Sequence, residues 1–316
     1  MKTVILDKCT VTNGDIDFSE LLGIGDTECF DLLPESDIAR VLRDADAVIC
    51  NKAQIDRKII ESCPKLKYIG LFATGYNNID TEAAKEHGIC VCNVPGYSTD
   101  AVAQHTFSFI LALSGSLCDY TASSSNGDWV RSKTFTYFPF PISELAGKAL
   151  GIFGYGSIGR TVAEIGRAFK MNIIVCTRSK PTDTNVELVS KEELFSRSDF
   201  LTLHAPLTKE TEKIVNTETL SLMKKSAYLI NTARGGCVDE KALADALNGG
   251  KIAGAGIDVL TVEPMCGNNP LLTAKNCLVT PHIAWAPKET RKRLIALVAK
   301  NLRAFKNGKP INVVNK

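Results

Sequence analysis

Three polar segments of the sequence carry side chains of the types that bind anions and transfer protons. Arg234 stands in NTARGG, Glu263 in DVLTVEP and His282 in TPHIAWA. Arginine offers a planar pair of donors to a carboxylate, and histidine exchanges a proton near neutral pH. Taken singly, each residue has a structural alternative: an arginine in a surface ion pair, a glutamate that caps a turn and a histidine packed in the core. Because each segment is expected to follow a strand of a parallel sheet, all three point to the ligand crevice at the carboxyl edge of that sheet.

A glycine motif lies between a predicted strand and a predicted helix. ALGIFGYGSIGR holds the G-x-G-x-x-G spacing in Gly154, Gly156 and Gly159. The first glycine permits a tight turn, the second allows a phosphate to approach the backbone, and the third allows the helix to pack on the strand. The N-terminus of such a helix binds a pyrophosphate through its free N–H groups. The motif therefore predicts a dinucleotide site that includes Ser157 and Ile158; a glycine turn without a ligand is the alternative.

The end of the next strand indicates which dinucleotide is preferred. An acidic side chain about 20 residues after the glycines would accept hydrogen bonds from the adenosine ribose of NAD. Here Thr177 is followed by Arg178, Ser179 and Lys180. A hydroxyl and two cations suit a 2′-phosphate better than a bare diol, so the sequence predicts NAD(P) as cofactor, with NADP favoured over NAD. Alternatively, both cations are merely solvated, and Arg178 could stack on the adenine of either cofactor.

Two series of short apolar runs, separated by helical segments, predict two α/β domains. The first series is TVIL, AVIC, YIGLF and CVCN, at residues 3–6, 47–50, 68–72 and 90–93. The second series lies at residues 149–153, 172–176, 200–204, 227–231, 253–258 and 277–280. This alternation is typical of parallel sheets covered by helices, and six strands fit one doubly wound domain. Long helices are expected at about 100–117 and about 287–306, the second returning to the first domain.

These motifs together resemble those of the D-isomer-specific 2-hydroxyacid dehydrogenases. The resemblance spans the chain and includes ATGYNNID (73–80), YSTDAVAQHT (97–106), ELAGK (144–148) and LHAPLT (203–208). Within the family, the sequence is most similar to the glycerate dehydrogenase or hydroxypyruvate reductase group. The resemblance implies a flavodoxin-like substrate domain, residues 1–100 plus 286–316, into which a Rossmann domain, residues 101–285, is inserted.

The resemblance also implies a role for each matching residue. Hydride would pass between the nicotinamide and C2 of a 2-oxo acid, while His282 donates a proton to the carbonyl oxygen. Glu263 would orient the imidazole and stabilise its protonated form, and Arg234 would bind the carboxylate and polarise the carbonyl. Thr74 and Gly75 would offer backbone N–H groups to the carboxylate. The remaining cofactor-binding residues implied are Pro206, Thr232 and Asp258; Asp258 would contact the nicotinamide carboxamide or, alternatively, cap a strand end.

The expected reaction is reduction of hydroxypyruvate or glyoxylate to the D-2-hydroxy acid by NAD(P)H. Two alternatives stay open at this point. One is a dehydrogenase for another 2-hydroxy acid, such as D-lactate. The other is a dinucleotide-sensing binding protein similar to the C-terminal binding protein corepressors, in which cofactor occupancy controls assembly.

The composition limits the other classes of partner. The 316 residues carry a formal net charge of +2 with no basic block, so nucleic acid is not expected. No apolar run approaches the ~20 residues that cross a bilayer, and charged residues interrupt the start, so no membrane partner and a cytoplasmic location are expected. The 11 cysteines include no CxxC pair and are interpreted as reduced thiols. The four histidines show no metal-ligand spacing, so no metal is predicted.

An aromatic segment at residues 123–141, SSSNGDWVRSKTFTYFPFP, is too irregular to predict a helix. Apolar side chains gathered in such a segment need a surface that covers them. A partner subunit would supply one, so a homodimer is expected, although an intramolecular surface would also serve.

Overall fold

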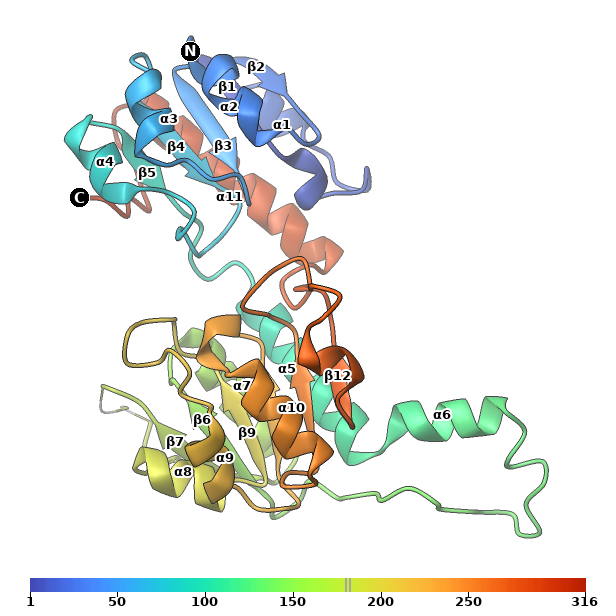
Figure 1. Cartoon of the computed structure of the whole chain (residues 1–316). Coiled ribbons are helices and arrows are strands. Elements are labelled where there is room, and N and C mark those ends of the chain that lie inside the picture. The colour runs from blue at the N-terminus through green and yellow to red at the C-terminus, as the bar shows by residue number, and fades with distance from the viewer. Residues whose placement is uncertain (180, 182) are drawn as a thin grey trace. The chain divides into compact units, whose positions relative to one another are not determined.

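The computed structural model describes residues 1–179, 181 and 183–316 (Figure 1). The chain divides into two compact units: unit 1 comprises Met1–Ser98 and Trp285–Lys316, and unit 2 comprises Thr99–Ala284. The boundaries expected from the sequence lie at 100/101 and 285/286, within two residues of these. Both units are α/β structures built on a parallel sheet.

Unit 1 is built on a five-stranded parallel sheet with the order β2-β1-β3-β4-β5. The strands are β1 (Lys2–Ile5), β2 (Asp26–Cys29), β3 (Ala47–Cys50), β4 (Tyr68–Leu71) and β5 (Cys90–Cys92). This order is that of flavodoxin-like sheets. The sequence predicted every strand except β2, which lies at the sheet edge, is partly exposed, and lacks the apolar run by which the others were found.

Five helices cover the two faces of this sheet. They are α1 (Ser19–Leu22), α2 (Glu35–Leu42), α3 (Arg57–Ser62), α4 (Thr81–Glu86) and α11 (Lys288–Lys306). Successive residues of a strand point to opposite faces, so Val4 packs with α2, α3 and α4, whereas Ile5 packs with α1 and α11. The C-terminal helix, predicted at about 287–306, therefore completes the core of unit 1 through Leu294, Val298 and Leu302.

Unit 2 holds a seven-stranded parallel sheet with the order β12-β11-β10-β9-β6-β7-β8. The strands are β6 (Ala149–Phe153), β7 (Asn172–Cys176), β8 (Glu187–Leu188), β9 (Phe200–Leu203), β10 (Tyr228–Asn231), β11 (Gly254–Ile257) and β12 (Cys277–Val279). Counted within the unit, six of these strands follow the 3-2-1-4-5-6 order of the Rossmann fold, and β12 extends it. All six predicted strands are present. The added strand β8 has two exposed residues and no apolar run to predict it.

Helices lie on both faces of the second sheet. α5 (Thr99–Ser114) and α7 (Ser157–Ala168) pack on one face, while α8 (Lys191–Arg197), α9 (Thr217–Leu222) and α10 (Glu240–Asn248) pack on the other. The helix expected at 100–117 ends at Ser114, because Ser116 adopts a left-handed conformation (φ 45°) and a new helix, α6 (Leu117–Ser125), begins. α6 also extends three residues into the segment expected to be irregular, and Figure 1 shows α6 and the chain after it projecting from the sheet.

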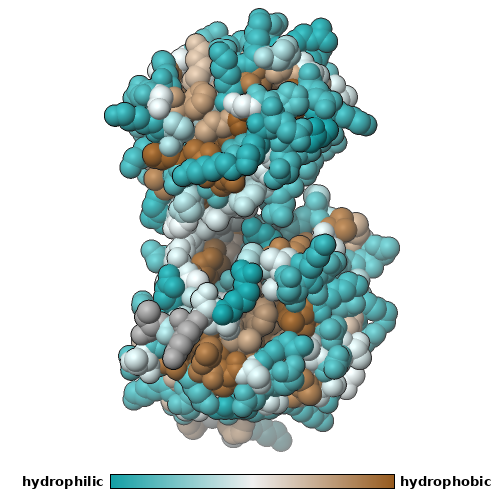
Figure 2. Space-filling view, turned by 90° about the vertical axis from the view of Figure 1, so that its left-hand side faces the viewer, coloured by the Kyte–Doolittle hydropathy of each residue, from teal (hydrophilic) through white to brown (hydrophobic). Residues whose placement is uncertain are grey.

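The surface of the chain is mainly hydrophilic in the view of Figure 2. Hydrophilic residues cover most of the face seen in Figure 2, and hydrophobic ones occur there in patches. Among the described residues, no single helix has the length and apolar character to cross a membrane. The bent pair α5 and α6, which meet at 59°, passes that test together by length and composition alone.

Candidate active site

His282 and Glu263 form a close pair at the carboxyl edge of the unit 2 sheet. The Nδ1 atom of His282 lies 2.7 Å from Oε2 of Glu263. Oε1 of the same carboxylate accepts a hydrogen bond from the backbone N–H of Leu260 at 2.9 Å. Each carboxylate oxygen is therefore engaged. Because Nδ1 faces the carboxylate, Nε2 is the ring nitrogen that remains to exchange a proton with a substrate.

The loop that carries His282 is held by Asp258, the residue after β11. The backbone of His282 is left-handed (φ 55°), and its N–H donates to the carbonyl oxygen of Asp258 at 2.8 Å. The Asp258 carboxylate accepts the N–H groups of Ile283 and Ala284, each at 2.9 Å, and the hydroxyl of Thr280 at 2.6 Å. A non-glycine residue in this conformation is strained and persists only where its surroundings hold it. The Asp258 side chain has no exposed surface, and its carboxylate supports the loop after β12.

His105 joins this network from α5, although no role was predicted for it. Its Nε2 lies 3.0 Å from the hydroxyl oxygen of Thr280. Because the single hydrogen of that hydroxyl is donated to Asp258, Nε2 of His105 must be the donor in this contact. Burial lowers the pKa of His105 and so keeps the ring neutral near pH 7. A histidine on a helix 175 residues away gives no local sequence signal for this contact.

Arg234 lies in the turn that follows β10. Asn231, at the end of β10, builds this turn by donating from Nδ2 to the Arg234 carbonyl at 2.9 Å and accepting the Ala233 N–H at 3.0 Å. Gly235 is required beside it, because a Cβ there would lie 1.9 Å from the carbonyl carbon of Leu260. Thr232 is buried with its hydroxyl 3.1 Å from that of Thr106 on α5.

The adjacent strands bring these segments to one edge. β10 pairs with β11 and β11 with β12, all parallel. Arg234, Glu263 and His282 follow these three strands in turn, so they lie along the same carboxyl edge, as the sequence predicted for their segments.

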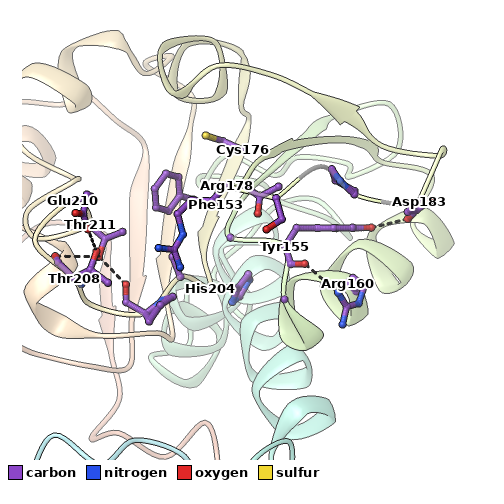
Figure 3. Close-up of a pocket in the computed structure, with 17 residues that line it drawn as sticks. Phe153, Tyr155, Arg160, Cys176, Arg178, Asp183, His204, Thr208, Glu210 and Thr211 are labelled. Carbon is purple, nitrogen blue, oxygen red and sulfur yellow. Dashed lines mark hydrogen bonds between the residues drawn. The ribbon is translucent and has the colours of Figure 1, made fainter.

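A cavity of about 680 Å³ opens at the end of β6, beside the glycine motif (Figure 3). Gly154 has φ +94°, and a Cβ there would lie 2.7 Å from the backbone nitrogen of Ala205. A Cβ on Gly159 would lie 2.3 Å from the Gly154 carbonyl oxygen. Helix α7 can therefore pack this closely on the strand only because residue 159 is glycine. A Cβ on Gly156, the N-cap of α7, would instead project into open space that a phosphate can occupy.

His204 supplies a second indication that this cavity receives a polar ligand. Both ring nitrogens are buried and have no hydrogen-bond partner in the described part of the chain, and burial lowers the pKa of the ring to about 3. Buried polar atoms without partners are rare and mark places where a ligand or water completes the bonding. The open position at Gly156 and the unpartnered His204 both fit a bound dinucleotide.

Most of the predicted cofactor residues line this cavity. Gly154, Gly156, Thr177, Arg178, Ser179 and Pro206 are among its lining residues. Ser157 and Ile158 begin α7 without lining it, and Asp258 and Thr232 lie at the other strand ends described above. Lys180, the second predicted cation, lies outside the described residues.

The cavity also contains acidic residues that the sequence did not single out. Asp183 accepts from the Tyr155 hydroxyl at 2.6 Å and from Arg167 at 2.5 Å. Glu210 follows LHAPLT and accepts from the Thr208 hydroxyl at 2.6 Å. Because both lie outside the expected position at the end of β7, only the folded chain brings them to the cavity.

Thr74 and Gly75 lie in unit 1, after β4. The Thr74 hydroxyl donates to the Val94 carbonyl at 2.8 Å, and the Asn93 side chain donates to the Thr74 carbonyl at 2.7 Å. These bonds fix the backbone of the predicted carboxylate-binding loop.

Comparison with known proteins identifies the class. Residues 107–284 match the family model described as D-isomer specific 2-hydroxyacid dehydrogenase, NAD binding domain. The chain belongs to this family of NAD(P)-dependent oxidoreductases, which confirms the resemblance recognised from its motifs.

Its relatives lie close to the group indicated by the sequence. The chain is 41% identical to the hydroxypyruvate reductase of Blautia hydrogenotrophica, over 100% of both proteins. It is 42% identical to the glycerate dehydrogenase of Methylorubrum extorquens, over 89% of this chain and 88% of the relative. Among solved structures, an acyclic imino acid reductase in complex with NADPH and D-Arg superimposes with a TM-score of 0.90 at 35% identity, covering 99% of this chain and 100% of the other.

Proposed function

We propose that this protein reduces a C2 to C4 2-oxo acid, hydroxypyruvate or glyoxylate, to the corresponding D-2-hydroxy acid, with NAD(P)H as reductant and His282 as proton donor. The observation that carries the proposal is the 2.7 Å contact between His282 and Glu263, on the same sheet edge as Arg234. The names of the relatives support hydroxypyruvate as the substrate.

Each residue has a defined task in this reaction. Bound NAD(P)H supplies a hydride to C2 of the 2-oxo acid. His282 transfers a proton from Nε2 to the carbonyl oxygen as that oxygen becomes a hydroxyl. Glu263 holds the ring through Nδ1 and stabilises the positive charge on the protonated imidazole. Arg234 binds the substrate carboxylate and draws electron density toward the carbonyl oxygen.

Each unit has its own proposed binding segment. In unit 2 the dinucleotide binds at Gly154 and Gly156, and in unit 1 the backbone at Thr74 and Gly75 is the segment proposed to bind a carboxylate. The bonds that fix Thr74 support this role, because a prearranged pair of N–H groups binds an anion without reorganisation.

NADP is the preferred cofactor in this proposal. Thr177, Arg178 and Ser179 line the cavity, and Thr177 leaves the end of β7 without a carboxylate. A cation at the end of β7, with no carboxylate at position 177, favours the charged 2′-phosphate.

A panel of 2-oxo acids, each assayed with NADPH and with NADH, tests the proposal. Hydroxypyruvate is expected among the two best substrates, and the product should be the D isomer. An arm with a 2-oxo acid plus an amine tests imino acids, because one structural relative is an imino acid reductase. Best activity in that arm, or with pyruvate alone, would overturn the substrate assignment; no oxidation of either cofactor in any arm would favour a dinucleotide-sensing protein.

The protein acts as a homodimer in this proposal, through α6 and the aromatic segment that follows it. Val130 and Phe135 are each 88% exposed and Phe138 is 77% exposed, which is costly unless another surface covers them. Substitution of Phe135 and Phe138 by Asp should convert a dimer to a monomer in sedimentation. A wild-type monomer would contradict this assignment. The cytoplasmic location stays a prediction.

A further inference from the structure

The cofactor cavity has a cation and a carboxylate that come from different strands. Arg178 follows β7, and Glu210 lies in the segment after β9. Figure 3 shows Glu210 with Thr208 and Thr211 on one side of the cavity and Tyr155 with Asp183 on the other. Both carboxylates line the same cavity as Arg178, so either could oppose a phosphate there.

Among the residues that the structure describes, only one of these carboxylates has a positive charge at hydrogen-bond distance. Asp183 is bonded to the Arg167 guanidinium, the Tyr155 hydroxyl and the Asn185 N–H, and the Tyr155 bond above all lowers its pKa to about 2. Glu210 accepts from the neutral hydroxyl of Thr208 at 2.6 Å. That hydroxyl bond, and to a smaller extent the charge of Arg178, lower the pKa of the Glu210 carboxyl. Both carboxylates are therefore ionised, but within the described part of the chain Glu210 is the one whose charge is not matched by a bonded cation, so its charge acts on Arg178 and on a ligand beside it.

We propose that Glu210 is a second determinant of cofactor specificity, which opposes the 2′-phosphate of NADP that Arg178 attracts. The inference rests on the proposed function, because it requires the adenosine ribose to lie in this cavity. The 2′-phosphate carries up to two negative charges, whereas the NAD ribose presents hydroxyls that can donate to a carboxylate. Glu210, in the segment after β9, thus opposes the 2′-phosphate in part as an acidic residue at position 177 would.

Fluorescence titrations with NADPH and NADH, without substrate, test this inference on the full-length protein. Glu210→Gln keeps an acceptor for the Thr208 hydroxyl but removes the charge. It should raise the ratio of the NADH Kd to the NADPH Kd by about threefold, the size expected for one charge at ~6 Å in a water-like dielectric. The increase in this Kd ratio should be smaller in 0.5 M NaCl, where the Debye length is about 4 Å, because salt screens exposed charges.

Glu212→Gln is the matched control, since Glu212 is exposed, two residues away, and not among the residues lining the cavity. It should leave the ratio unchanged, while Arg178→Gln should lower it. An unchanged ratio in Glu210→Gln, or a parallel change in both Kd values, would overturn the inference and indicate a role in loop structure. Equal binding of the two nucleotides by the wild type would contradict the proposed NADP preference instead, and the effect of Glu210→Gln would still be read from the same titration.

Discussion

Nδ1 of His282 lies 2.7 Å from Oε2 of Glu263, although the two residues are 19 positions apart and follow different strands. Parallel pairing of β11 with β12 brings their loops together. The contact orients the imidazole and leaves Nε2 for the substrate. It is the arrangement of a general acid supported by a carboxylate.

Removing the charge of Glu263 should slow proton transfer. Glu263→Gln keeps an acceptor for His282 but no longer stabilises its protonated form, so kcat with hydroxypyruvate should fall by about 10²-fold. His282→Gln removes the acid itself and should cost at least as much. The NADPH Kd, measured by fluorescence, should change little in either variant. A Glu263→Gln enzyme with kcat within twofold of the wild type would remove Glu263 from the mechanism.

Thr280 should act on the reaction through the position of His282. Thr280→Val deletes the hydroxyl bond to Asp258 and the acceptor for His105, so the loop with φ 55° at His282 loses support. We expect kcat to fall about tenfold with little change in KM, because a small displacement of a catalytic group is costly. Thr280→Ser should restore most of the loss, and Thr273→Val, at an exposed threonine, should have no effect. Failure of serine to rescue would assign the effect to packing of the threonine methyl.

His204 should make the protein less stable in acid. Its pKa is lowered to about 3 in the folded state, against about 6.5 when unfolded, so the unfolded chain binds one more proton between these values. Its contribution to stability is therefore full above pH 6.5 and falls as the pH drops toward 3, by about 1.4 kcal/mol per pH unit. When the pH is lowered from 7 to 5, the Tm of His204→Gln should fall less than the Tm of the wild type. His87→Gln, at an exposed histidine, is the control; equal losses in His204→Gln and wild type would show that His204 titrates normally.

The end of β7 should control cofactor preference. Thr177→Asp combined with Arg178→Ala places a carboxylate where a 2′-phosphate would bind and removes the cation. The ratio of kcat/KM with NADH to that with NADPH should rise at least about tenfold, equivalent to ~1.4 kcal/mol. An unchanged ratio would mean that these side chains do not contact the adenosine ribose.

The strands could be predicted wherever they are apolar and enclosed by helices. β3 (AVIC) and β9 (FLTL) are fully buried. A strand buried on both faces needs a continuous apolar run, and these runs are what made the two strands predictable. β2 and β8 lie at sheet edges and are partly exposed, so backbone pairing alone defines them and no side-chain pattern marks them. The break between α5 and α6 depends on the backbone of Ser116, whose conformation is unusual for a non-glycine residue.

The candidate site likewise contains features that the local sequence determines and features that depend on tertiary contacts. The sequence by itself determined the glycine motif, the missing acid at Thr177 and the residue types at 234, 263 and 282, because each is a local requirement of a turn, a strand end or a reaction. Only the tertiary structure decided that the Asp258 carboxylate supports the loop of His282, that Tyr155 and Arg167 donate to Asp183, and that Glu210 shares a cavity with Arg178. These contacts join residues from different strands and helices, and their distances arise from the order in which the strands pair, which local spacing does not encode.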